Sequence, residues 1–227
     1  MIAPRQVRAE WLDVLPADDP RALRSRRELA RVNAIMANAS MVAAPLRAGG
    51  VPASIVDLGA GDGRFALRLA RALGTAPEGA RMTLVDRQTG IDAAARRGLE
   101  ALGWRVVPAQ ADVFDWLEQA GPCAAVVANL FLHHFPDAEL ARLLGLIASR
   151  TRRFVACEPR RSQLAGLGAR LLGTIGFGPV TRHDAIASVR AGFAGDELTA
   201  LWPRAPGWAT EERSRGAFSH LFVAERP

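Results

Sequence analysis

Residues 55–65 read IVDLGAGDGRF, and this stretch decides the fold. A short apolar run reaches Asp57, and Gly59, Gly61 and Gly63 then follow at alternate positions before a segment with helical spacing. Glycine suits such a turn because a Cβ would keep the backbone away from a ligand, and because some turn positions need a positive φ. The stretch therefore predicts a strand, a nucleotide-binding turn and a helix.

The spacing of this turn separates two kinds of nucleotide site. A dinucleotide pyrophosphate site follows the pattern GxGxxG and leaves the start of the helix clear of carboxylates. Here the glycines follow GxGxG, and Asp57 and Asp62 lie beside the turn. Negative side chains in this place suit a ligand that carries positive charge. A dinucleotide site and a plain tight loop stay open as alternatives.

Apolar, β-branched segments alternate with helical periodicity on both sides of the turn. We expect strands at 54–59, 81–86, 104–112, 123–132 and 152–159, and helices at 64–73, 91–102, 114–120 and 138–149. This alternation predicts a parallel sheet with helices on both faces. Ligands of such sheets bind outside the carboxyl ends of the strands.

The flanking segments have other patterns. The first 46 residues predict a helical arm, in which Asp19 caps a helix that begins at Pro20. Further helices are expected at 161–175, 183–192 and 195–203, before two terminal strands close enough in sequence to form a hairpin. We expect a single domain, residues 1–227, made of the arm (1–46), a ligand-binding core (47–160), a helical lid that forms the acceptor region (161–205) and the hairpin (206–227).

The glycine turn and the order of elements resemble class I S-adenosylmethionine (SAM)-dependent methyltransferases. The likeness covers about residues 50–160 and extends to the hairpin. It implies a Rossmann-like, seven-stranded mixed sheet with helices on both faces, a C-terminal β-hairpin and a helical lid. It also implies SAM as the cofactor and S-adenosylhomocysteine (SAH) as its product.

The resemblance implies which residues hold the cofactor. Within the first motif they are Asp57, Gly59, Ala60, Gly61 and Gly63.

Four further cofactor residues lie at the ends of the second, third and fourth expected strands, and Arg87 is included because it directly follows Asp86. Asp86 would accept the ribose hydroxyls, although an aspartate that merely starts a turn is the alternative. Asp112 would hold the adenine amino group and Val113 the adenine ring, whereas we interpret Asp115 as a helix cap. Asn129 would offer its backbone carbonyl to the ammonium group of the cofactor.

The segment ANLFLHHF, residues 128–135, resembles the quinone-methylating and small-molecule branch of the family. His133 or His134 could act as a general base or orient the acceptor, because imidazole titrates near neutral pH. Both could instead be structural. His183 is a third candidate base, with Asp184 either orienting it or capping a helix. Glu158 could bind substrate or pair with a neighbouring arginine.

Composition removes several enzyme classes. All 29 basic residues are arginine, and tyrosine is absent too. P-loop nucleotide sites, Schiff-base enzymes and the tyrosine–lysine pair of short-chain dehydrogenases are therefore excluded. The net charge of +6 and the isoelectric point near 11.1 do not indicate a nucleic-acid partner, because the arginines are spread along the chain.

These observations lead to one expected function, which is methyl transfer from SAM to a small, largely apolar or aromatic metabolite. An RNA or protein methyltransferase and a silent SAM-binding regulator are the alternatives, and a dinucleotide oxidoreductase ranks behind them. We expect no metal, because no Asp/Asn cluster stands out. No segment has the length of a membrane span or the apolar core of a signal peptide, so we expect a cytoplasmic protein. A homodimer stays open.

Overall fold

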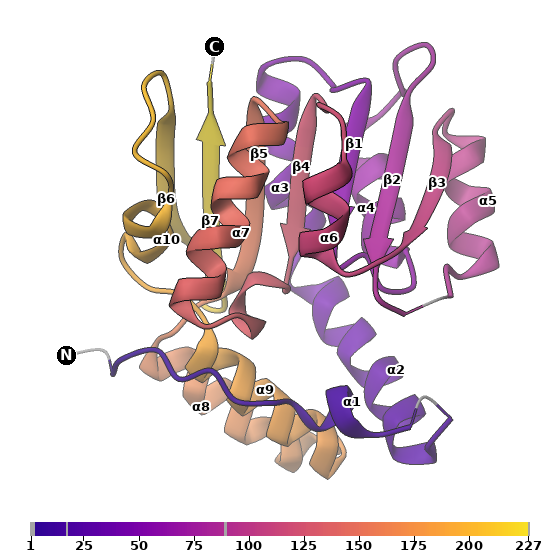
Figure 1. Cartoon of the computed structure of the whole chain (residues 1–227). Coiled ribbons are helices and arrows are strands. Elements are labelled where there is room, and N and C mark those ends of the chain that lie inside the picture. Colours follow the sequence, from indigo (N-terminus) through magenta and orange to yellow (C-terminus); the bar gives the residue numbers. More distant parts are fainter. Residues whose placement is uncertain (1–2, 17, 89, 227) are drawn as a thin grey trace.

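The computed structural model describes residues 3–16, 18–88 and 90–226, so the outermost ends of the expected arm and hairpin lie outside it. In this part of the chain seven strands form one sheet in the order β3-β2-β1-β4-β5-β7-β6 (Figure 1). The strands are β1 (Ser54–Leu58), β2 (Arg81–Asp86), β3 (Arg105–Gln110), β4 (Ala125–Asn129), β5 (Arg153–Pro159), β6 (Ala209–Arg215) and β7 (Ser219–Glu225). β1 to β5 are parallel, and β7 is antiparallel to both β5 and β6. The predicted mixed sheet with a C-terminal hairpin is confirmed.

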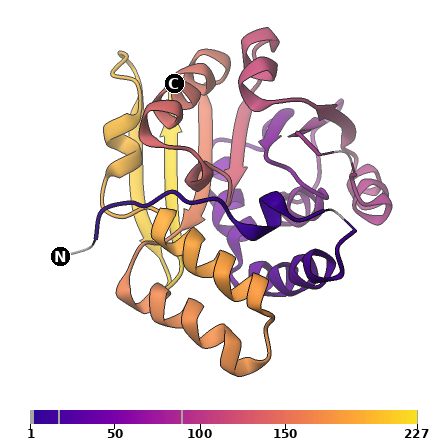
Figure 2. The ribbon, with the colours of Figure 1, turned by 60° about the horizontal axis from the view of Figure 1, so that its bottom comes forward.

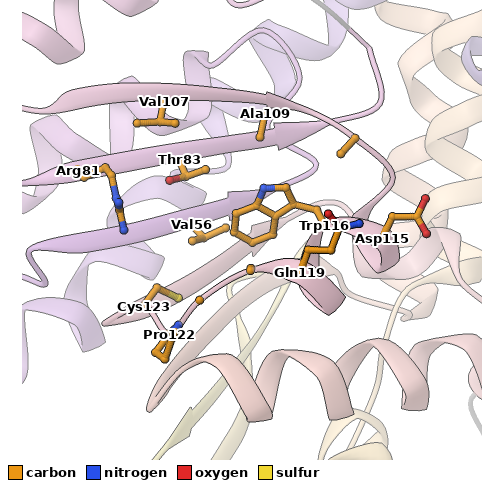
Figure 3. A pocket seen from close by; sticks show the side chains of 13 residues that line it. Val56, Arg81, Thr83, Val107, Ala109, Asp115, Trp116, Gln119, Pro122 and Cys123 are labelled. Carbon is orange, nitrogen blue, oxygen red and sulfur yellow. The ribbon is translucent and has the colours of Figure 1, made fainter.

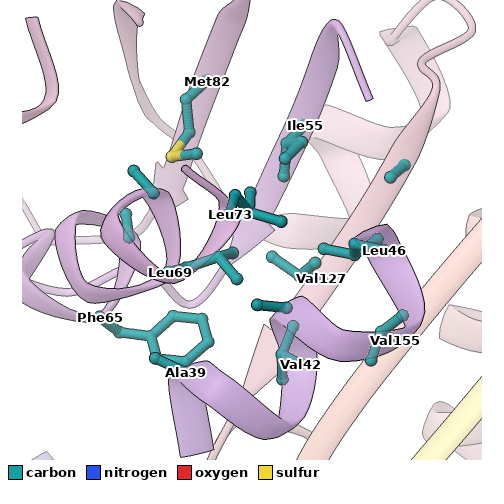
Figure 4. Close-up of a cluster of buried hydrophobic side chains, with 14 of the residues drawn as sticks. Ala39, Val42, Leu46, Ile55, Phe65, Leu69, Leu73, Met82, Val127 and Val155 are labelled. Carbon is teal, nitrogen blue, oxygen red and sulfur yellow. The ribbon is translucent and has the colours of Figure 1, made fainter. Parts of the chain in front are cut away.

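Helices cover both faces of the sheet. Successive side chains of a strand point to opposite faces, and here both sets are apolar, so each face needs helices to bury it. Ile55 and Val127 pack on one face against α3 (Asn38–Ala48), α4 (Arg64–Leu73) and α5 (Ala93–Ala101), as Figure 4 shows for part of this core. Val56 and Val126 point to the other face. They pack against α6 (Val113–Gln119), α7 (Asp137–Arg150) and α10 (Glu197–Leu201).

The remaining helices lie at the edge of the sheet where the parallel strands end (Figures 1 and 2). They are α1 (Trp11–Val14), α2 (Pro20–Ile35), α8 (Gln163–Leu171), a 3-10 turn (Leu172–Ile175) and α9 (Pro179–Ala191). α9 packs against α1, α2 and α8. Figure 2 shows the first described residues, which precede α1, running as an extended segment across this edge. Among the described helices, none combines the length and apolar character that crossing a membrane requires.

The expected helix positions were partly wrong. Asp19 caps α2 as predicted, by accepting a hydrogen bond from the Arg21 backbone. The arm then breaks at Ala37, whose φ of +54° is left-handed, and α3 begins directly after it. α9 begins at Pro179 rather than at His183, because proline fits the first turn of a helix.

The fourth strand is shorter than expected. It ends at Asn129, because Leu130 has a left-handed φ of +54°. Residues Leu132–His134 then form a 3-10 turn, η1, where the sequence had suggested that the strand continues. A left-handed conformation is strained for leucine, and such strain is often found at functional sites. It turns the two histidines out of the sheet and toward α9.

Truncating a leucine in the core should test this packing. Leu69 of α4 is fully buried, so Leu69→Ala should lower the free energy of unfolding by about 2–5 kcal/mol through lost burial and a cavity. Leu23 of α2 is 46% exposed, and the matched change Leu23→Ala should cost much less. Urea unfolding followed by circular dichroism measures both. Equal losses of unfolding free energy in the two variants would contradict the placement of Leu69 in the core and of Leu23 on the surface.

Candidate functional site

The turn between β1 and α4 has the conformation that its glycines predict. Gly59, Gly61 and Gly63 have φ values of +69°, +54° and +77°. The amides of Gly59 and Ala60 both donate to the carbonyl of Val85, at 2.9 and 3.1 Å, which ties the turn to the end of β2. A Cβ on Gly59 would lie 2.2 Å from the ring of Phe131, so the turn and the segment after β4 are in close contact.

Asp86 lies where β2 ends, next to the glycine turn. Its Oδ2 accepts a hydrogen bond from the Gly61 amide at 2.9 Å, and its Oδ1 accepts one from the Gln88 amide at 2.8 Å. A carboxylate has about four acceptor positions, so further donors can still bind to it. Arg87 is exposed beside it, and its carbonyl accepts a hydrogen bond from the Gln110 side chain.

The structure assigns the role of helix cap after β3 to a different aspartate than expected. Asp112, not Asp115, is the N-cap of α6, and its Oδ1 accepts a hydrogen bond from the Phe114 amide at 2.8 Å. The helix begins at Val113, one residue earlier than expected, which places Asp115 in the exposed first turn. Capping occupies one oxygen of Asp112, and Val113 is buried directly behind it.

A cavity of about 580 Å³ joins these elements at the carboxyl edge of the sheet. Gly59, Gly61, Asp86, Arg87, Asp112, Val113 and His134 all line it, so most of the predicted residues come together. The arm closes the opposite side with Val7, Arg8, Ala9 and Asp13. Phe131 and Phe135, which meet edge to face at 5.1 Å between ring centroids, add aromatic walls.

Four predicted cofactor residues lie beside this cavity rather than in its lining. Ala60 lines a smaller neighbouring cavity of about 200 Å³ together with Gly61 and Asp86. Gly63 forms the N-cap of α4. Asp57 is buried, and the side chain of Asn129 accepts a hydrogen bond from Asn38 at 3.0 Å.

A separate cavity of about 520 Å³ lies against the middle of the sheet (Figure 3). Val56, Thr83 and Val107 form its floor, and Trp116 and Cys123 lie on its other side. No glycine-turn residue lines it. Because ligands of parallel α/β sheets bind at the carboxyl ends of the strands, the cavity beside the glycine turn is the candidate site.

His133 is held in a buried cluster of carboxylates. Its Nδ1 lies 2.8 Å from Glu158 Oε2, and its Nε2 lies 3.5 Å from Glu10 Oε1. Burial by itself would lower the pKa of His133, but hydrogen bonds with Glu10 and Glu158 outweigh it and raise the pKa to about 9. His133 is therefore protonated at neutral pH, and each of its two N–H groups faces a carboxylate.

The sequence interpretation of Glu158 was wrong. Glu158 is fully buried and neither faces the cavity nor pairs with an arginine. It accepts hydrogen bonds from the backbone amides of Phe131, Leu132 and His133. Glu10 was not recognised at all, because a single glutamate in an irregular arm gives no sequence signal.

His134 is the histidine that faces the cavity. Its side chain is 31% exposed and its ring lies over that of His133, with 4.2 Å between centroids. Burial, and after it the positive charge of His133, lowers the pKa of His134 below its ordinary value of 6.5. At neutral pH its imidazole is therefore unprotonated and able to accept a proton.

The comparisons with known proteins agree with this geometry. The family described as methyltransferase domain matches residues 55–153, from β1 to the start of β5. These residues therefore form a methyltransferase domain, as the resemblance implied.

Solved structures share the fold of this methyltransferase. The plantazolicin methyltransferase BpumL in complex with SAH is 12% identical, with a TM-score of 0.65 and 92% of each chain covered. An O-methyltransferase family protein from Burkholderia thailandensis is 21% identical, with a TM-score of 0.63, and the match covers 92% of this chain and 61% of that one. Magnesium protoporphyrin IX methyltransferase from Synechocystis PCC 6803 with bound SAH is 19% identical, with a TM-score of 0.52 and coverage of 85% and 83%. Among curated protein sequences none matches the chain.

The residues of this methyltransferase fit SAM. Asp57 is 1% exposed, its Oδ2 has no hydrogen-bond partner among the described residues, and burial, helped by the nearby charge of Asp86, raises its pKa to about 8. A buried carboxyl group without a partner is costly, and a cationic group beside the glycine turn lowers that cost. SAM carries two such groups, its ammonium and its sulfonium.

One group of potential metal ligands occurs in the described part of the methyltransferase. Glu10, His133 and His134 offer ligand atoms that lie within 4.8 Å of one another. Both ring nitrogens of His133 already face carboxylates, an arrangement that holds a proton between them. We interpret the group as a proton-binding cluster, and the expectation of no metal stays a prediction.

His183 lies apart from the other two candidates. It stacks on Trp11, with 4.1 Å between ring centroids, and is not among the residues that line the cavity. Asp184 does not cap α9, because that helix begins five residues earlier. Its carboxylate accepts hydrogen bonds from the amides of Trp11 and Leu12 and contacts His183 Nδ1 at 2.9 Å. Asp184 therefore fastens α1 to α9.

The cluster around His133 predicts a pH-dependent stability. Folding raises the pKa of His133 from its ordinary value of 6.5 to about 9, so the folded state binds this proton more tightly. The resulting stabilisation is complete below about pH 6.5 and disappears as pH rises through about 9. The difference in free energy of unfolding between the wild type and His133→Gln should therefore shrink across this range.

Urea unfolding of both proteins at several pH values measures that difference. Subtracting the variant removes the contribution of Asp57, whose raised pKa also destabilises the fold as pH rises. A difference that stays constant from about pH 6 to pH 9.5 would contradict the protonated cluster.

Proposed function

We propose that this methyltransferase acts on a small, largely apolar or aromatic metabolite, such as a phenol, a quinone precursor or a polyketide-like compound. The observation that carries the proposal is the cavity of about 580 Å³ at the carboxyl edge of the sheet, which has the size of a small-molecule site. Phe131 and Phe135 line it from the core, and Val7 and Ala9 line it from the arm. Long macromolecular acceptors need an open surface instead, so these walls favour the small-molecule branch.

SAM is held at the carboxyl edge of the sheet in this proposal. The glycine turn admits it, because Gly59 and Gly61 place no side chain on the cavity wall and Ala60 and Gly63 beside them are small. Asp86 accepts the ribose hydroxyls with its remaining acceptor positions, next to Arg87. Asp112 and Val113 bind the adenine, through the oxygen not used in capping and through the backbone. Asp57 and the carbonyl of Asn129 compensate the ammonium charge.

The chemistry that SAM supplies is a methyl group already activated on a sulfonium. The protein aligns the acceptor and removes its proton. Asp13 lies 3.9 Å from Nδ1 of His134 and favours the ring proton on that nitrogen, which leaves Nε2 to accept the proton of the acceptor hydroxyl. Burial and, after it, the charge on His133 lower the pKa of His134 and keep its ring neutral, so His133 is a positioning residue. His183, outside the cavity lining, holds α1 in place.

The two outer helical segments form the lid in this proposal. Helices α1 and α2 of the arm (1–46) pack against α9 of the segment 161–205 beside the core (47–160), and strands β6 and β7 of the hairpin (206–227) complete the sheet of one domain. Arg5 supports the closed arrangement, because its guanidinium donates to the carbonyls of Phe135 and Ala191 at 2.6 and 2.8 Å and pairs with Asp137.

Removing the carboxylate of Asp86 should weaken SAM binding. Asp86→Ala loses two charge-assisted hydrogen bonds to ribose, so the Kd for SAM should rise about 10- to 100-fold. Asp115→Ala is the matched control, because this exposed carboxylate lies outside the cavity. Isothermal calorimetry with SAM, SAH and NAD measures the effect. Wild-type affinity for SAM in Asp86→Ala would refute the ribose role, and binding of NAD without SAM would refute the cofactor assignment.

Replacing His134 should slow methyl transfer without affecting SAM. His134→Gln should lower kcat on a phenolic acceptor about 10²- to 10⁴-fold while the Kd for SAM stays unchanged. In the wild type kcat should fall on the acid side with an apparent pKa below 6.5, because only the neutral imidazole accepts a proton. This limb should vanish in the variant. The control is His183→Gln, and a larger loss there than in His134→Gln would show that the wrong histidine has been assigned.

A further inference from the structure

A second cavity opens on the lid, on the other side of the arm. It has a volume of about 750 Å³ and lies between the arm, α8 and α9. Figure 2 shows these three elements side by side, with the arm crossing α9. Its charged residues are Arg8, Arg161, Arg170 and Arg190, and we call it the arginine groove. No aspartate or glutamate is among its lining residues, all of which the structure describes.

Three of these arginines are free to bind a ligand. Among the described residues, the side chains of Arg8, Arg170 and Arg190 have no hydrogen-bond or ion-pair partner, and all three residues are exposed. Arg161 differs, because it is buried and donates to the carbonyls of Ala3 and Gly192 and to Glu197. It fixes the start of the arm and leaves the excess positive charge to the other three.

The groove also has an apolar side. Ile186 and Val189 of α9 are half-buried in its wall, and Leu167 of α8 is 52% exposed beside Gly166. A hydrated inorganic ion gains nothing from such surface. An organic anion gains from both parts, because its hydrocarbon covers the apolar side chains while its carboxylate or phosphate pairs with guanidinium groups.

The extended arm separates this groove from the candidate active site. Successive side chains of an extended chain point to opposite sides. Gln6 lines the groove, Val7 and Ala9 line the active-site cavity, and Arg8 lines both. The two cavities are therefore divided by one strand of backbone, with a guanidinium at the boundary.

We propose that the arginine groove binds an anionic group, a carboxylate or a phosphate, that the methyl acceptor carries at a distance from its reacting atom. The inference rests on the proposed function for the reacting end. The apolar or aromatic part occupies the cavity beside SAM, and the chain that links it to the anion passes the arm at Arg8. The acceptor class is thus an amphipathic acid or phosphate ester rather than a neutral aromatic compound.

Direct anion binding tests the groove without any methyl transfer. Inorganic pyrophosphate, titrated calorimetrically at constant ionic strength, should bind saturably to the wild type. The double variant Arg170→Gln/Arg190→Gln should weaken this binding about tenfold or more, because two charge-assisted contacts are lost. Arg182→Gln is the matched control, since Arg182 is exposed on α9 but does not line the groove. Absence of saturable binding, or equal loss in the control, would overturn the proposal.

A chain-length series tests the link to the acceptor. Acids with a para-hydroxyphenyl group at one end are compared with their primary amides as substrates. Beyond a certain chain length the acids should have a KM about tenfold lower than the amides, and the double variant should raise that KM without changing kcat. Both variants should keep wild-type affinity for SAM, which reports an intact fold and cofactor site.

The outcomes separate the two proposals. Pyrophosphate binding that the double variant weakens, with no phenol methylated, would support the groove and contradict the proposed acceptor. Methylation of acids and amides with equal KM at every chain length would support the acceptor and overturn the groove as part of its site. A phosphate-ester series that shows the KM effect when the carboxylates do not would identify phosphate as the anion.

Discussion

The buried carboxylate of Glu158 is the contact on which the geometry of the site depends. It lies near the end of β5 and accepts hydrogen bonds from the amides of Phe131, Leu132 and His133, as well as contacting the His133 ring. These amides belong to the turn that follows β4, where Leu130 has already left the strand conformation. Without Glu158 the buried amides would lose their acceptor, which costs more than an ordinary surface hydrogen bond.

Ionic contacts of His133 also connect the arm to Glu158. His133, protonated between Glu158 and Glu10, connects the end of the sheet to a residue of the arm. Asp184 and Arg5 add further fastening points on α9 and on the turn. Because the fastened segment is extended, its alternating side chains form one wall of the active-site cavity and one wall of the arginine groove. The single position of the arm thus creates both surfaces.

Much of the cofactor edge could be predicted from local sequence. Glycines at alternate positions, and Asp86 at a strand end, are recognised from a few neighbouring residues, and the parallel strands then bring them together. The errors concern partners that only packing selects. A helix cap is expected at Asp115, and at Asp184 as one of two alternatives, because aspartate is a good cap, yet the helices begin at Val113 and Pro179. Glu158 was expected to face the crevice, but its strand end lies under the turn it holds.

The sequence by itself determined the succession of strands and helices along the chain and the glycine turn, because hydrophobic periodicity and backbone freedom are local properties. The mixed sheet and SAM as the cofactor were implied by the family resemblance of these motifs. Only the tertiary structure decided which histidine faces the cavity. His133 and His134 are neighbours of the same residue type, and they differ because Glu10 and Glu158 come from distant parts of the chain to surround one of them. The same long-range placement gives the abundant arginines their different roles. Arg161 is buried and paired, whereas Arg8, Arg170 and Arg190 face an open groove.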